Sequence, residues 1–239
     1  KTGYTWKNGV LLELSEAVKK TLKPGKNVIA AHCHNKENGG YVDFGLFRKQ
    51  SADNNFSADA EQLSVDVLPT QTFYSFRCGP VILDVIFTSP LLADDLDLVS
   101  TPISYITYQV RPHEVLVYFE ASPQLAVHED NQPVVYDREL KNGISYLRTG
   151  TVNQPILERK GDGVRIDWGY AHLDAPRTAD REMSLGEYFQ VKRHFIQNGH
   201  LPVSAAPDTL ERNMLKEMNV LAYCDRMGKV GAEGKSGYV

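Results

Sequence analysis

Hydrophobic and polar residues alternate with a period of two through much of the segment 68–110, LPTQTFYSFRCGPVILDVIFTSPLLADDLDLVSTPISYITYQV. Apolar or β-branched side chains occupy every second position of 72–78 and of 81–87, and the pair Gly79-Pro80 between these runs predicts a hairpin turn. A third strand is expected at 103–110, after an acidic loop. Because each strand of an antiparallel sheet buries one face and exposes the other, the pattern predicts a mainly β domain.

The rest of the chain adds strands and little helix. Ser15 can cap a helical turn that runs to Leu22, and the apolar stripe of 185–197 predicts a helix that Gly199 stops. The stretch 210–227 is ambiguous, because its first half has a helical pattern whereas VLAYC alternates like a strand; we favour a strand at 220–227. Further strands are predicted at 11–14, 27–33, 41–46, 62–67, 115–121, 134–138, 144–149 and 164–173. The whole pattern is typical of a large antiparallel β-sandwich with one or two short helices.

A change of composition divides the chain. Residues 50–60 are rich in Ser, Asp, Asn and Ala and have few apolar anchors, as a linker or surface loop does. We therefore expect one domain in 1–49, a linker at 50–60 and a second domain in 61–239. The first part has too few strands to cover a sheet face, so it is expected to pack on something else.

Composition and charge restrict the class of partner. The chain has 239 residues, 42% of them hydrophobic, and a formal net charge of -4. No apolar run is long enough to span a bilayer, so no membrane span is expected in this segment. No basic stripe interleaved with aromatic residues is present, which argues against nucleic acid as a partner. Small, neutral partners fit this composition better.

Thiol and metal chemistry have little support in the sequence. The three cysteines, Cys33, Cys78 and Cys224, lie far apart and form no C-x-x-C pair. Cys33 and Cys78 fall within apolar strand patterns, so we interpret them as small buried hydrophobes. On a strand His32 and His34 would share a face, but a metal site would need a third ligand from elsewhere. We interpret both histidines as hydrogen-bonded sheet residues and expect no metal and no cofactor.

Two polar segments have residues that could bind a ligand. Asp94, Asp95 and Asp97 form an acidic loop that lacks the glycine and terminal Glu of a calcium loop, so a solvated turn is expected. In the segment Asp167-Trp168-Gly169-Tyr170 the glycine allows close backbone approach, and a Trp beside a carboxylate and a Tyr can stack a sugar ring or hold a small polar ligand. The alternative is that Trp168 is a core residue, as a lone Trp on a strand commonly is.

Catalytic motifs are missing from the sequence. It contains no G-x-S-x-G, no P-loop, no H-E-x-x-H and no carboxylate pair at a defined spacing. The residues alone therefore indicate no catalytic residue.

Two resemblances to known families can be named from longer stretches. LKPGKNVIAAHCHN followed by GGYVDFGL, within about residues 1–47, resembles the closing strands of the jelly-roll sugar-binding domain of β-galactosidase-like glycoside hydrolases. The part from about residue 60 to 239 is similar to the N-terminal β domain of the bacterial and fungal glutaminase-A-like family. LSVDVLPTQTFYSFRCGPVILDVIFTSPLL, ISYITYQV, YFEASPQLAV, RIDWGYAHL and VLAYCDRMGKVG carry that second resemblance.

The second resemblance implies a supersandwich-like β domain that precedes a helical (α/α)₆ barrel. That barrel is expected to carry the acid and base carboxylates and to lie outside this chain, so this segment alone is expected to be inactive. Loops of the sandwich could roof the substrate pocket. By this resemblance Asp167, Trp168, Asp225 and Arg226 are the first candidates for substrate binding.

Three functional hypotheses remain open. The first is the non-catalytic β-sandwich portion of a secreted or periplasmic glutaminase-like hydrolase, whose partners are the C-terminal helical barrel of the same protein and a small amide or sugar substrate. The second is a carbohydrate-binding or accessory module of a glycoside hydrolase. The third is a purely structural segment that mediates domain packing. Apolar surface for a following domain is expected at Leu201-Pro202-Val203 and at Met214, Leu215 and Met218.

Overall fold

The computed structural model describes residues 13–24, 27–30, 58–203, 209–213 and 218–239. The chain divides into two compact units, Lys1–Ser51 and Ala52–Val239. Among the described residues of the first unit, the single-turn helix α1 (Glu16–Lys19) begins where it was predicted, because the Ser15 hydroxyl accepts a hydrogen bond from the Val18 N–H. Residues 13–14 and 27–30 are not strands, contrary to prediction. The predicted strand 41–46 and the His32-Cys33-His34 cluster lie outside the described residues.

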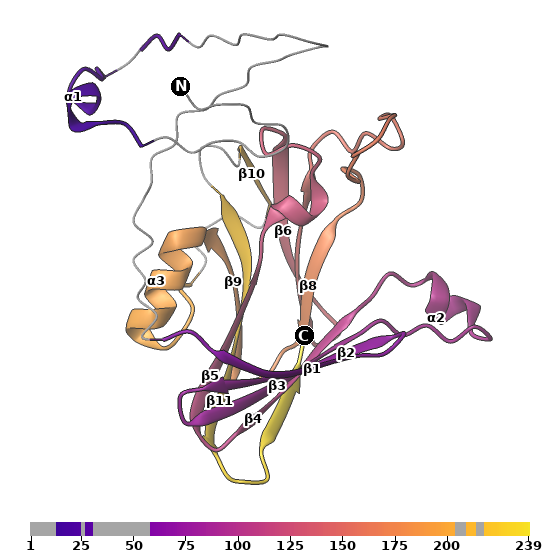
Figure 1. Ribbon diagram of the computed structural model, residues 1–239. Coiled ribbons are helices and arrows are strands. Elements are labelled where there is room, and N and C mark those ends of the chain that lie inside the picture. Colours follow the sequence, from indigo (N-terminus) through magenta and orange to yellow (C-terminus); the bar gives the residue numbers. More distant parts are fainter. Residues whose placement is uncertain (1–12, 25–26, 31–57, 204–208, 214–217) are drawn as a thin grey trace. The chain divides into compact units, whose positions relative to one another are not determined.

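The second unit is mainly β and sandwich-like, as the sequence predicts, and its described strands form three antiparallel sheets (Figure 1). The first sheet has the order β1 (Glu61–Val67), β2 (Gln71–Cys78), β3 (Val81–Thr88), β4 (Tyr105–Arg111), β12 (Lys235–Tyr238). The second has the order β10 (Thr209–Asn213), β6 (Pro133–Lys141), β7 (Ile144–Thr151), β8 (Ala171–Pro176). The third has the order β5 (His113–Ala121), β11 (Asn219–Val230), β9 (Arg181–Glu187).

Short helices complete the described part of this unit. They are α2 (Leu96–Ser100), the 3-10 helix η1 (Pro123–Ala126) and α3 (Tyr188–Asn198). With α1, the described residues form three α-helices instead of the expected one or two. The additional helix is α2, which lies in the acidic loop: the Asp95 carboxylate caps it by accepting a hydrogen bond of 2.9 Å from the Leu98 N–H. The solvated turn that was predicted there is thus partly helical.

The β2–β3 hairpin confirms the alternation that opened the sequence analysis. Tyr74 pairs with Val85, and the register is unbroken from Gln71 to the turn. Gly79 has φ of +62°, a left-handed conformation that glycine adopts without steric cost. The hairpin turn predicted from Gly79-Pro80 therefore depends on the glycine.

The hydrophobic core lies between the inward faces of the three sheets. Each sheet contributes buried side chains, among them Val110 from β4, Tyr136 from β6 and Leu221 from β11. Strand β11 is buried on both faces: Leu221 and Tyr223 belong to this core, whereas the alternate residues pack against α3. A strand covered on both sides needs apolar residues at successive positions, so VLAYC is a continuous apolar run and does not alternate as the sequence analysis expected, although the strand predicted there is confirmed.

The helix predicted at 185–197 begins later than its apolar pattern suggests. Leu185 lies in β9 and pairs with Leu221, so its side chain enters the core from a strand. The Glu187 carboxylate then caps α3 by accepting a hydrogen bond of 2.8 Å from the Gln190 N–H. The predicted stop is confirmed, because Gly199 ends α3 with φ of +70° and its N–H bonds to the Phe195 carbonyl.

The strand predicted at 164–173 is wrong in its first part. Residues 164–170 form a loop, and β8 begins only at Ala171. Apolar residues of this loop, such as Ile166, are exposed and do not alternate into the core. The strands predicted at 62–67, 103–110, 115–121, 134–138, 144–149 and 220–227 each correspond to an observed strand within a few residues.

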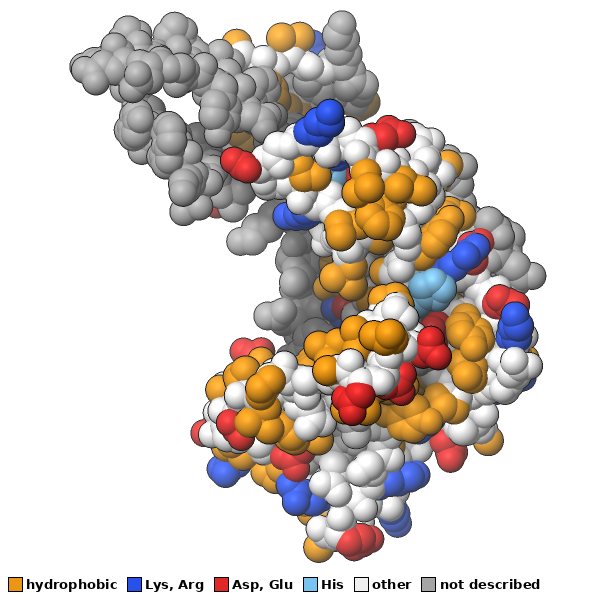
Figure 2. Space-filling model, turned by 90° about the vertical axis from the view of Figure 1, so that its right-hand side faces the viewer, with side chains coloured by type: hydrophobic (Ala, Val, Ile, Leu, Met, Phe, Trp, Pro, Cys, Tyr) orange, Lys and Arg blue, Asp and Glu red, His pale blue; other side chains and the backbone are white. Residues whose placement is uncertain are grey.

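Exposed apolar side chains lie on the β3–β4 connection. Leu91, Leu92 and Leu96 are each more than half exposed, next to the carboxylates of the acidic loop. Figure 2 shows hydrophobic side chains gathered beside acidic ones on this side of the molecule.

Of the residues expected to be exposed for a following domain, Leu201 is instead buried and Val203 is exposed. No helix in the described part of the chain is both long enough and apolar enough to span a membrane.

Candidate functional site

The four candidate residues form two separate sites. Asp167 and Trp168 lie in the connection between β7 and β8, and Asp225 and Arg226 lie on β11. Asp167 and Asp225 belong to separate hydrogen-bond networks, and no described contact joins the two pairs. The structure therefore does not bring the four candidates together into one pocket.

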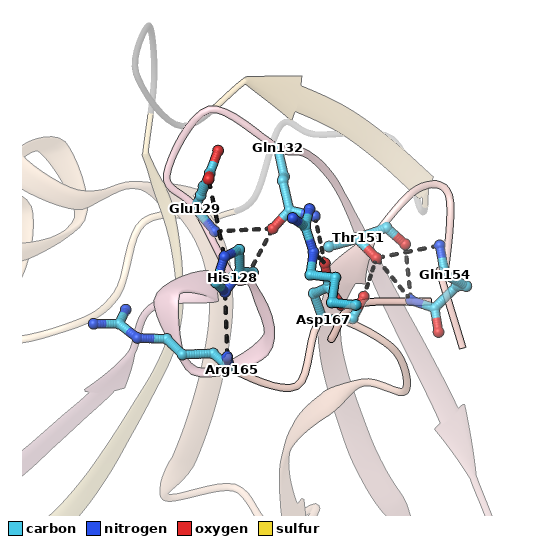
Figure 3. A network of polar contacts seen from close by, with 8 residues as sticks. His128, Glu129, Gln132, Thr151, Gln154, Arg165 and Asp167 are labelled. Carbon is cyan, nitrogen blue, oxygen red and sulfur yellow. Dashed lines mark hydrogen bonds and ion pairs between the residues drawn. The ribbon is translucent and has the colours of Figure 1, made fainter. Parts of the chain in front are cut away.

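Asp167 holds two loops together (Figure 3). Its side chain is buried, and Oδ2 accepts hydrogen bonds of 2.8 Å from Gln132 Nε2 and 2.7 Å from Arg159 Nε. Its backbone carbonyl accepts a hydrogen bond of 2.6 Å from the Thr151 hydroxyl. Gln132 comes from the loop before β6, so the carboxylate ties that loop to the β7–β8 connection.

Two glutamine side chains extend this network. Gln132 Oε1 accepts from the backbone N–H groups of His128 and Glu129, at 2.7 and 2.9 Å, while its amide nitrogen donates to Asp167 (Figure 3). Gln154 donates to the carbonyls of Thr151 and Gly169 and accepts from the Gly169 N–H at 2.6 Å. Both amides thus bond backbone groups in the loop before β6, at the end of β7 and in the β7–β8 connection.

The β7 backbone and the loop that carries Trp168 lie close together, and this depends on Gly150 as well as Gly169. A Cβ added at Gly150 would lie 2.6 Å from the Gly169 carbonyl oxygen and 2.8 Å from a ring carbon of Tyr170. Gly169 itself has open space and is needed for its φ of +78°. The sequence analysis expected Gly169 to allow close backbone approach. In the structure it is Gly150 on β7 whose missing side chain leaves room for the Gly169 carbonyl.

The environment of Asp167 favours a permanent carboxylate. Burial raises its pKa, but the hydrogen bonds from Arg159 and Gln132 outweigh burial and bring the pKa below the usual value for Asp. A carboxylate with a lowered pKa that is already bonded to an arginine is a poor proton acceptor. Asp167 is therefore suited to holding loops and not to acid–base chemistry.

Trp168 is partly buried beside this network. Its neighbour Tyr170 is exposed and carries the guanidinium of Arg148 over its ring, 4.5 Å from the centroid. One face of the Tyr170 ring is thus occupied by a cation of the same chain. Binding of a ligand by Trp168 stays a prediction.

Asp225 joins two sheets. It is buried on β11, and its Oδ2 accepts hydrogen bonds of 2.6 Å from the Tyr108 hydroxyl and 3.2 Å from Arg181 Nε. The Tyr223 hydroxyl lies 2.7 Å from that of Tyr108 and 3.3 Å from the carboxylate. Burial raises the pKa of Tyr223 to about 12, and burial with the hydrogen bond to Asp225 raises that of Tyr108 further. Both phenols therefore stay protonated and donate.

Arg226 points the other way from Asp225, as successive residues of a strand do. It is exposed and forms an ion pair with Glu182 of β9, while its N–H donates to the Asp180 carbonyl at 2.9 Å. Its interactions thus lie within the described third sheet and its adjoining turn. An exposed pair of this kind contributes little to stability.

The partners of these residues were not predicted from the sequence. Tyr108 and Asp225 are 117 positions apart, and Gln132 and Asp167 are 35 apart, so no local spacing connects either pair. Gln132 and Arg159 lie in polar loops, where glutamine and arginine are common and therefore do not stand out. Within the described residues, no group of three or more His, Cys, Asp or Glu side chains is placed to hold a metal ion.

Comparison with known proteins identifies a family for this chain. No curated protein matches the chain. The model of a family described as a domain of unknown function, DUF5127, matches residues 70–239, which include every described strand except β1. This match covers most of the chain, which therefore belongs to the DUF5127 family.

Proposed function

We propose that this chain is the non-catalytic β-sandwich portion of a glutaminase-like hydrolase, and that another part of the parent protein supplies the catalytic (α/α)₆ barrel. The observation that carries the proposal is the state of its two buried acids. Asp167 and Asp225 are both engaged by an arginine and by further donors of the same chain. Neither is available as a general base, so the chemistry is assigned to residues elsewhere.

The glutaminase-like part of the proposal comes from the resemblance of residues 60–239, and the jelly-roll interpretation of 1–47 comes from that of the first segment. The glutaminase-like resemblance also supports a secreted or periplasmic location and a small amide as the substrate of the parent protein. The competing hypothesis is an accessory module of a glycoside hydrolase. It predicts the same inactive sandwich but a different substrate.

Glutamine hydrolysis tests the proposal. The purified 239-residue chain is expected to release no ammonia from glutamine above a blank without protein. The parent protein, expressed from the full reading frame, is expected to hydrolyse glutamine, and Asp167→Asn and Asp225→Asn are expected to leave its kcat within about threefold if the variants fold.

Two results would overturn the proposal. One is glutamine hydrolysis by the chain alone that Asp167→Asn or Asp225→Asn abolishes. The other is a parent protein that hydrolyses 4-nitrophenyl glycosides and leaves glutamine intact, which would favour the glycoside hydrolase hypothesis.

A further inference from the structure

A row of polar side chains crosses the outer face of the first sheet. Strand register places one residue from each strand directly opposite the next, from Ser64 on β1 to Ser236 on β12. The complete row is Ser64, Ser75, Asp84, Gln109, Ser236. Alternate residues such as Leu83 and Val85 face the core on the other side. With strands spaced about 4.8 Å apart, the row is about 19 Å long.

A groove lies over this row. Its volume is about 380 Å³, within the range of roughly 300–1,000 Å³ of small-molecule sites. Residues from all five strands line it, including Ser64 and Ser236 of the two edge strands. The groove therefore runs across the sheet, perpendicular to the strands, and suits an elongated ligand better than a compact one.

The groove offers hydrogen-bonding groups but no unpaired charge at its centre. Asp84 accepts a hydrogen bond of 2.7 Å from the Ser75 hydroxyl and forms an ion pair with Arg111. The hydroxyls of Ser64 and Ser236 and the amide of Gln109 have no hydrogen-bond partner among the described residues. These three groups are free to bond a ligand, and Asp84 keeps lone pairs for a ligand hydroxyl.

An apolar strip lies beside the polar row. Phe73 on β2 and Ile86 on β3 pair directly, two residues along their strands from Ser75 and Asp84 and therefore on the same face of the sheet, and both line the groove. Both are only partly buried. A ligand with hydroxyls along one edge and C–H groups on its flat face would match the row and the strip together.

We propose that this groove binds a neutral oligosaccharide chain. Uncharged hydroxyl and amide groups beside an aromatic ring fit linked sugar rings, and the closed Asp84–Arg111 pair favours neither an anion nor a cation. A free amino acid would leave its two charges without separate partners, at a high desolvation cost. The inference goes beyond the proposed glutaminase-like function and does not rest on it.

Isothermal titration calorimetry of the 239-residue chain tests the site. The probes are cellohexaose, xylohexaose, maltohexaose, laminarihexaose and mannohexaose, with glutamine as the free amino acid. At least one oligosaccharide is expected to bind. Gln109→Ala and Phe73→Leu, which keeps an apolar side chain, are each expected to raise its Kd by about tenfold or more. Far-ultraviolet circular dichroism and thermal unfolding check that both variants are folded.

Gln62→Ala is the matched control, because Gln62 is exposed on β1 and pairs with Phe76, on the opposite side of the same sheet. It is expected to leave the Kd unchanged. Absence of binding by every oligosaccharide at millimolar concentration would overturn the inference, as would binding that folded Gln109→Ala and Phe73→Leu leave intact. Binding of glutamine in the groove would overturn the ligand class. The glutaminase proposal is judged by hydrolysis alone, so the two fail separately.

Discussion

The hydroxyl of Tyr108 on β4 donates a hydrogen bond of 2.6 Å to the carboxylate of Asp225 on β11, and this buried contact joins the first sheet to the third. Tyr223 and Arg181 complete the set of donors around the same oxygen. An ionised group is stable in such a place only when several donors compensate its lost hydration. The network is therefore a structural joint between sheets.

Removal of the carboxylate should cost more than removal of one donor. Asp225→Ala leaves Tyr108 and Arg181 without their acceptor, and we expect it to lower the free energy of unfolding by about 3 kcal/mol or more. Tyr108→Phe removes one hydrogen bond to a charged group and should cost about 2 kcal/mol. Urea denaturation followed by circular dichroism measures both.

Tyr105→Phe is the control, because Tyr105 lies on the same strand but is exposed, and among the described residues its side chain makes only a ring contact with Tyr238. It should change stability by less than about 0.5 kcal/mol. Equal effects of Tyr105→Phe and Tyr108→Phe would contradict the assignment of Asp225 as a joint between sheets.

How far the sequence predicts this fold depends on the range of the interaction. The β2–β3 hairpin was predicted because period-two alternation and Gly79 are local signals. The start of α3 was placed too early, because Leu185 satisfies a helical stripe and also faces the core from β9. Only pairing with Leu221, distant in sequence, decides between the two.

The candidate site was predicted in part for the same reason. Asp167 and Asp225 were named because the stretches RIDWGYAHL and VLAYCDRMGKVG carry the family resemblance. Nothing in the neighbouring sequence distinguishes their partners Gln132 and Tyr108. A buried hydrogen bond between residues far apart in sequence follows from the fold and not from spacing. The groove over Gln109 could not be predicted either, because it forms from the pairing of five strands. One of these is β12, which is far from β4 in sequence but pairs with it.

The Asp167 network should make stability depend on pH. Its folded-state pKa is lowered, and an unfolded Asp has a pKa of about 3.9. The stabilisation from the ionised form is therefore complete above the unfolded-state pKa and is lost as the pH falls through the folded-state pKa. Asp167→Asn should cost about 1–2 kcal/mol at neutral pH, and its difference from the unmodified chain should shrink below about pH 4.

Urea denaturation at a series of pH values from neutral to acid gives this difference. Asp162→Asn is the matched control in the same connection, since Asp162 is exposed and has no hydrogen bond or ion pair among the described residues. It should leave the stability profile unchanged. A difference for Asp167→Asn that stays constant down to the acid limit would rule out the depressed pKa.

Gly150→Ala should destabilise the loop that carries Trp168. The new Cβ would meet the Gly169 carbonyl oxygen, which belongs to backbone held by Gln154 and has little room to move. We expect a loss of about 1–3 kcal/mol in the free energy of unfolding. Adding Tyr170→Ala removes the second clash but not the first, so the double variant should regain only part of the loss. Full recovery in the double variant would show that the backbone contact does not limit the site.

Cys224 should be protected from alkylation in the folded protein. It is fully buried between β11 and α3, and burial raises the pKa of its thiol to about 11, so little thiolate forms near neutral pH. Cys78, at the end of β2, is only partly buried. Under native conditions iodoacetamide should therefore modify Cys224 roughly tenfold or more slowly than Cys78, as measured by peptide mass spectrometry. In guanidinium chloride the two rates should become similar, because unfolding removes the burial that separates them. Equal native rates would mean that α3 opens readily and does not seal the outer face of β11.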